Sequence, residues 1–100
     1  MGTVTLQVTM TNGAGVEASW IRIDAKSVEI RNGKGTIDVD GSALQQTFSY
    51  WFLGDSGSKL TFEIKQDNRS LKKVEDAIAV GFDRAVGSGH FKLKSPEGLW

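Results

Sequence analysis

Hydrophobic and polar residues alternate along several segments of the chain. From Val4 to Met10 every even position is apolar, and every odd position between them is polar. Side chains on an extended chain point alternately to opposite faces, so this period predicts strands with one face turned to a core. Extended segments are expected at residues 4–10, 16–23, 27–30, 37–39, 46–53, 59–66, 78–82 and 90–94.

The connections between these segments contain residues that tight turns favour. Asn32-Gly33 lies between two alternating runs, and this dipeptide is the strongest short-range hairpin signal. It predicts that residues 28–30 pair with residues 37–39. The glycine- and serine-containing loop at residues 54–58 predicts a second hairpin.

Two further predictions concern the second extended segment and the glycines near the end of the chain. In residues 16–23 the apolar set changes from even to odd between Trp20 and Ile21, so either both faces of this strand are partly covered or a bulge lies near these two residues, and we expect the strand to be central in its sheet. The Gly-Ser-Gly sequence at residues 87–89 predicts a turn before the last strand.

Residues 67–76 are the one segment in which helical spacing competes with alternation. Leu71, Val74 and Ile78 lie three and four residues apart, which predicts a single helical turn near residues 70–76. About seven or eight short strands separated by turns predict an all-β, antiparallel, two-sheet β-sandwich of immunoglobulin-like or transthyretin-like type. A small closed β-barrel is the alternative.

Composition limits the size of the fold and the classes of partner. The 100 residues match one domain, so we expect a single β-sandwich over residues 1–95 and a C-terminal tail at residues 96–100. Twelve basic residues balance twelve acidic ones, so no net field attracts nucleic acid. No segment is apolar for long enough to predict membrane insertion.

The chain contains no cysteine, which excludes disulfides and thiolate metal sites. This composition fits the cytoplasm, and no signal peptide is evident at the start of the chain. A secreted bacterial module from which a signal has been removed fits equally well. We expect a soluble protein, and its compartment stays open.

No grouping of reactive residues predicts catalysis. His90 is the only histidine, and without cysteine it cannot form the usual zinc sites. No serine lies in a Gly-x-Ser-x-Gly sequence. Asp38, Asp40 and Gly41 resemble the start of a calcium loop, but the remaining ligands do not follow. We therefore expect no enzyme activity, no metal and no cofactor.

The aromatic residues carry the only functional signal. Residues 50–52 are consecutive aromatics, and a strand turns only alternate side chains to one core, so Trp51 points away from its two neighbours. An exposed Trp51 near Gln46, Ser49 and Lys65 suits stacking on a sugar ring or burial against a partner protein. Coverage of Trp51 by the connection at residues 67–76 is an equally strong alternative.

The other two tryptophans have different expected positions. Trp20 is expected in the core, and Trp100 is expected in the tail or against a neighbouring chain.

The sequence thus predicts a non-catalytic binding module that recognises carbohydrate or another small ligand through Trp51. The alternative is a structural or protein-interaction subunit that assembles through an edge strand or a tryptophan patch, including as a homo-oligomer. An enzyme with a carboxylate site around Asp38 and Asp40 is the third and weakest hypothesis.

Overall fold

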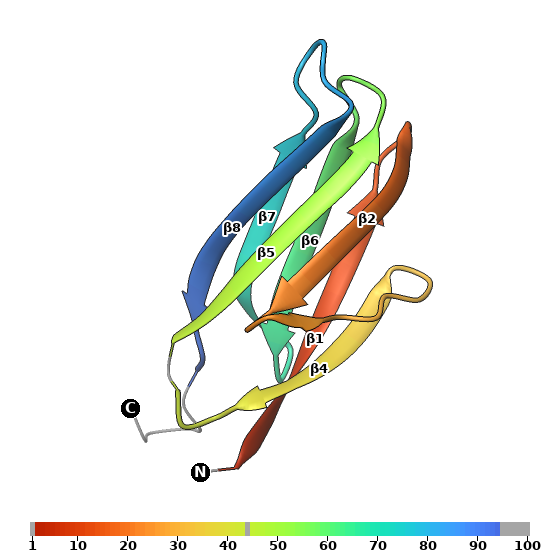
Figure 1. Cartoon of the computed structure of the whole chain (residues 1–100). Helices are drawn as coiled ribbons and strands as arrows, with labels where there is room; N and C mark the ends of the chain where they lie inside the picture. The colour runs from red at the N-terminus through yellow and green to blue at the C-terminus, as the bar shows by residue number, and fades with distance from the viewer. Residues whose placement is uncertain (1, 44, 95–100) are drawn as a thin grey trace.

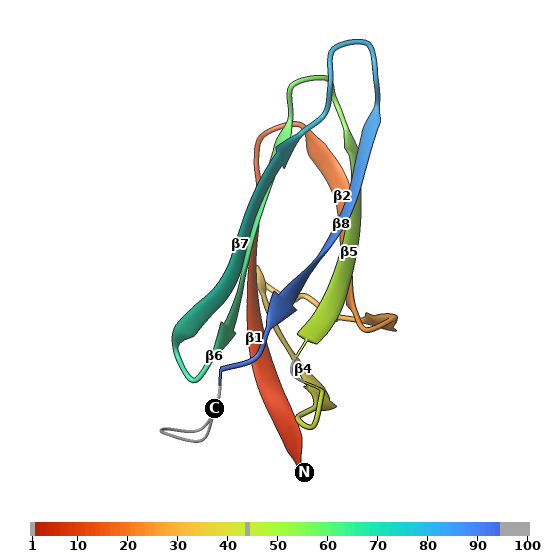
Figure 2. The same ribbon diagram turned by 90° about the vertical axis from the view of Figure 1, so that its left-hand side faces the viewer.

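The computed structural model describes residues 2–43 and 45–94, which form two antiparallel four-stranded sheets stacked face to face (Figures 1 and 2). The strands are β1 (Thr3–Asn12), β2 (Val16–Ile23), β3 (Lys26–Ser27), β4 (Lys34–Asp40), β5 (Gln45–Gly54), β6 (Lys59–Gln66), β7 (Arg69–Ala77) and β8 (Arg84–Lys92). The expected all-β sandwich is confirmed, and the described strands do not close into a barrel. The predicted tail at residues 96–100, with Trp100, lies outside the described residues.

One sheet has the strand order β4-β1-β6-β7, and the other has the order β3-β2-β5-β8. In Figure 1 the strands β2, β5 and β8 lie in front of β1, β6 and β7. Most connections cross from one sheet to the other. The expected hairpin at residues 54–58 is therefore wrong, because β5 pairs with β2 and β8, whereas β6 pairs with β1 and β7.

The turn at Asn32-Gly33 is present, but the hairpin predicted around it is not. Both residues have positive φ, 53° and 79°, and Arg31 and Lys34 exchange two backbone hydrogen bonds of 2.8 and 3.0 Å. Beyond this bridge the two sides separate. Residues 34–40 pair with β1, whereas the backbone N–H of Val28 donates to Ile21 of the other sheet. The segment at residues 28–30 therefore connects one sheet to the other instead of pairing with residues 37–39.

The helical turn expected at residues 70–76 is wrong, because these residues belong to β7. The strand joins β6 through Asp67-Asn68, both with positive φ, in a hairpin that was not predicted from the sequence. The register with β6 shifts by one residue at Leu71. This bulge lets both Leu71 and Val74 pack against the core although they are three residues apart, and so it imitates helical spacing.

The register shift in β2 lies at Glu17, between Val16 and Ala18, and not near Ile21 as the parity suggested. Because alternation is regular beyond Glu17, Ile21 turns inward and is buried. Trp20 turns outward and is 41% exposed, so the expectation of a core position for Trp20 is also wrong.

Residues 78–82 form the connection between β7 and β8 rather than the predicted strand. Ile78 is buried in the core, whereas Val80 and Phe82 are 90% and 64% exposed. This connection forms one end of the molecule (Figures 1 and 2). The predicted turn at residues 87–89 is wrong as well, since these residues lie within β8.

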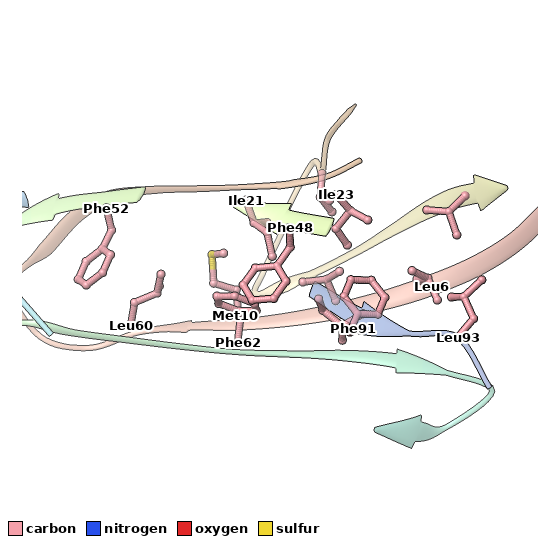
Figure 3. Packing of buried hydrophobic residues seen from close by; sticks show 14 of the residues in the cluster. Leu6, Met10, Ile21, Ile23, Phe48, Phe52, Leu60, Phe62, Phe91 and Leu93 are labelled. Carbon is pink, nitrogen blue, oxygen red and sulfur yellow. The ribbon is translucent and has the colours of Figure 1, made fainter. Parts of the chain in front are cut away.

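The core fills the space between the two sheets. Figure 3 shows Ile21, Phe48 and Phe52 of one sheet facing Leu60 and Phe62 of the other. The buried apolar side chains are Leu6, Val8, Met10, Ile21, Ile23, Val28, Val39, Phe48, Phe52, Leu60, Phe62, Ile64, Ile78, Phe91 and Leu93. They come from both layers, and their burial supplies the main favourable term in folding.

Candidate functional site

Two tryptophans lie side by side on the outer surface of one sheet. Trp20 of β2 is directly opposite Trp51 of β5, and Trp51 is directly opposite Val86 of β8. The two indole rings have centroids 4.5 Å apart and planes inclined by 35°. Although they contact each other, Trp51 remains 43% exposed, close to the exposure of Trp20. The result is an apolar row across three strands in contact with solvent.

A polar row lies beside this apolar row. Two positions along each strand from the tryptophans and Val86, Arg22 faces Ser49 and Ser49 faces Ser88. Residues two apart on a strand share a face, so both rows point to the same side of the sheet. A surface hollow of about 550 Å³ is lined by both rows. We call the six residues of the two rows the tryptophan face: Trp20, Arg22, Ser49, Trp51, Val86 and Ser88.

A second hollow, of about 560 Å³, adjoins the tryptophan face and shares Arg22, Ser49 and Ser88 with it. Its other lining residues include Thr47 and His90, which face each other on β5 and β8. Asp24 also lines it, and its Oδ1 accepts hydrogen bonds from the backbone N–H of Thr47 at 3.0 Å and from the Thr47 hydroxyl at 3.3 Å.

Of the residues predicted to accompany Trp51, the structure brings only Ser49 to it. Gln46 is fully buried on the core side of β5, where its Nε2 donates to the carbonyl oxygen of Ala43 at 2.7 Å. Lys65 belongs to β6 of the other sheet and lies 3.7 Å from Glu63. The predicted grouping of Gln46 and Lys65 with Trp51 is therefore wrong.

The segment proposed to cover Trp51 does not do so, since residues 69–77 form β7 in the other sheet. Sequence reasoning missed Trp20, Arg22 and Ser88. The outward positions of Trp20 and Arg22 follow from the buried Ile21 and Ile23 of the same strand, which was the available signal.

The two carboxylates of the third hypothesis lie on β4 in local interactions. Asp38 accepts a hydrogen bond of 2.6 Å from the Thr5 hydroxyl. Asp40 accepts from the backbone N–H and the hydroxyl of Ser42, and these hydrogen bonds hold the pKa of the Asp40 carboxyl below its ordinary value. Among the described residues no group of three or more His, Cys, Asp or Glu side chains could hold a metal ion.

Tyr50 reaches from β5 toward β7. Its hydroxyl donates a hydrogen bond of 2.7 Å to Oδ2 of Asp76, and its ring meets that of Phe62 edge-on with centroids 5.2 Å apart. Burial, together with the hydrogen bond and the negative charge of Asp76, raises the pKa of Tyr50 from 10.0 to about 12. The neutral phenol is thus favoured in the folded state.

This pKa predicts how stability depends on alkaline pH. Because the folded state holds the phenol proton more tightly than the unfolded chain, the stabilisation is complete below pH 10 and is lost as the pH rises through about 12. Tyr50 is the only tyrosine, so absorbance of tyrosinate reports it alone. We expect a midpoint near pH 12 in the folded protein and a lower midpoint in Asp76→Asn. A midpoint at 10 in the unmodified protein would contradict the buried, hydrogen-bonded position.

No helix long and apolar enough to cross a membrane occurs in residues 2–43 and 45–94. Comparison with family models, with curated proteins and with solved structures finds no significant match.

Proposed function

We propose that this protein is a non-catalytic binding module that recognises carbohydrate on the tryptophan face. The observation that carries the proposal is the pair Trp20 and Trp51, which lie in contact on a solvent-facing sheet surface with more than two fifths of each side chain exposed. Neither ring belongs to the buried core. Large apolar side chains gathered in one patch on a protein surface commonly mark an interaction site.

The polar row beside the two rings favours a sugar as the ligand. A pyranose has faces of C–H groups and a rim of hydroxyls. The indoles offer flat apolar surface to the C–H groups, while Ser49, Ser88 and Arg22 offer hydrogen-bonding groups to the hydroxyls. Apolar surface with a few convergent polar groups is the usual make-up of a small-ligand site.

A protein-interaction subunit is the second candidate, and it is favoured by a different surface. Val80 and Phe82 project from the connection between β7 and β8 and are largely exposed. The backbone around them is held in place, because the Ser56 hydroxyl accepts from the N–H of Gly81 at 3.1 Å and donates to the carbonyl oxygen of Phe82 at 3.0 Å. A fixed apolar tip suits insertion into a pocket of another chain.

The carbohydrate proposal predicts that Trp51→Ala weakens glycan binding about tenfold, because a lost aromatic contact of about 1.4 kcal/mol changes affinity by that factor. Isothermal titration calorimetry with soluble oligosaccharides of glucose, mannose, N-acetylglucosamine and galacturonic acid measures the affinity of each protein for the glycan. Circular dichroism verifies that the variant is folded. Trp20→Ala is expected to act in the same direction.

Phe82→Ala is the matched control, since it removes an exposed aromatic ring from a surface other than the tryptophan face. It should leave glycan affinity unchanged. Failure of every oligosaccharide to bind would overturn the carbohydrate proposal. If light scattering then showed a concentration-dependent dimer that Phe82→Ala dissociates, the protein-interaction candidate would replace it.

A further inference from the structure

Arg22 is the charged residue of the tryptophan face, and it has no ion-pair partner within the part of the chain that the structure describes. The three ion pairs found there join Arg31 with Glu29, Lys65 with Glu63, and Arg84 with Asp83. The nearest acidic residue along the chain is Asp24, directly after β2, and its Oδ1 already accepts hydrogen bonds from the backbone and hydroxyl of Thr47. The guanidinium of Arg22 is thus left available to a ligand.

The position of Arg22 connects the two hollows of this sheet. Arg22 is one of the residues that line both of them. On its own strand the next residue on the same face is Trp20, whose ring contacts that of Trp51. The guanidinium and the two indoles therefore border the same hollow.

The hollow beside the indoles carries a positive charge although the chain as a whole is neutral, because Arg22 is the only charged residue in its lining. Alternation with the buried Phe91 turns His90 and Lys92 to the outward side of β8. On that side of residues 22–24, 45–53 and 84–92, Arg22 and Lys92 are positive and Asp24 is negative, while Arg84 is paired with Asp83. Such a surface favours an anionic ligand over a neutral one.

We propose that the carbohydrate bound on the tryptophan face is acidic, and that Arg22 binds the carboxylate of a uronic acid unit while Trp20 and Trp51 hold a sugar ring. This inference rests on the proposed carbohydrate function and names its ligand class. A planar guanidinium matches a carboxylate with two parallel N–H···O hydrogen bonds between opposite charges, and neutral sugar hydroxyls lack that charge.

The test compares oligogalacturonate with the same oligosaccharide after methyl esterification, which keeps the sugar rings and removes the charges. Isothermal titration at low and at moderate salt is the measurement. We expect the acid to bind about tenfold to hundredfold more tightly than the ester, as for hydrogen bonds to charged groups. Arg22→Gln should abolish this preference, so that the acid and the ester bind the variant with similar affinity.

Arg31→Gln is the matched control, because it removes the same charge from an arginine that pairs with Glu29 outside the tryptophan face. It should keep the preference for the acid. Equal binding of acid and ester, with both lost in Trp51→Ala, would overturn the acidic ligand and leave the carbohydrate function standing. Binding of the acid that Trp51→Ala does not affect would indicate simple ion attraction and would overturn the inference. Absence of binding to any oligosaccharide would overturn both proposals.

Discussion

Phe62→Ala is expected to lower the free energy of unfolding by about 3–5 kcal/mol, the range for removing a large buried aromatic side chain. Phe62 is 1% exposed and lies on β6 in the middle of the core (Figure 3). Its ring meets those of Phe48 and Tyr50 edge-on, with centroids 5.7 and 5.2 Å away. A domain typically has only about 5–15 kcal/mol of stability, so the variant should be close to the limit of folding.

Urea unfolding followed by tryptophan fluorescence measures this change. Phe82→Ala is the control, because it makes the same chemical change at a side chain that is 64% exposed. Its effect should stay within about 0.5 kcal/mol, as is usual for surface substitutions. Similar losses in the two variants would contradict the assignment of Phe62 to the core and Phe82 to the surface.

Gly87→Ala is expected to cost about 1–3 kcal/mol, the range for forcing extra volume into a packed position. Gly87 turns toward the interior from β8, and the ring of Tyr50 occupies the space that a Cβ would take. An added methyl group has to displace that ring. The displacement disturbs the hydrogen bond to Asp76 and the contact with Phe62. Glycine within a strand is otherwise unfavourable, and here it is explained by the close approach of an aromatic ring.

A double-mutant cycle tests this cause directly. In a Tyr50→Ala background the obstructing ring is absent, so Gly87→Ala should cost almost nothing. Residues in direct contact typically show coupling energies of about 0.5–3 kcal/mol, and urea unfolding of the four proteins yields the value. Ser88→Ala, at the neighbouring solvent-facing position, should be nearly neutral. Additive effects of the Tyr50 and Gly87 changes would rule out the steric explanation.

Alternation predicted most of the strands and the layered architecture, because a two-residue period with one buried face has few other physical explanations. It failed where a single residue changes the period. Glu17 in β2 and Leu71 in β7 each shift a register by one position. The first shift hid the outward position of Trp20, and the second imitated a helical turn. Bulges of this kind leave no consistent local signal in a single sequence.

The pairing of strands that are distant in the chain was the second feature that the sequence could not predict. Ser49 was correctly predicted next to Trp51, since the two residues share a face of one strand and this relation needs no tertiary information. Gln46 has the opposite parity and was misplaced. The position of Lys65 relative to Trp51 depends on which sheet contains β6. The positions of Arg22 and Ser88 depend on which strands border β5. Turn residues could not determine this, since a turn such as that at residues 32–33 also serves a chain that changes sheets.

The strand order also determines how the polypeptide reaches its native state. Among the described strands, β6 and β7 are the only long neighbours that are consecutive in the chain, whereas β1 meets β4 and β6, and β5 meets β2 and β8. The β6–β7 pair can form within about 1–10 μs, the usual time for a hairpin. Both sheets must then bring together remote parts of the chain, which places folding in the range of about milliseconds to seconds. The hairpin at residues 59–77 therefore opens and closes many times before the rest of the molecule assembles around it.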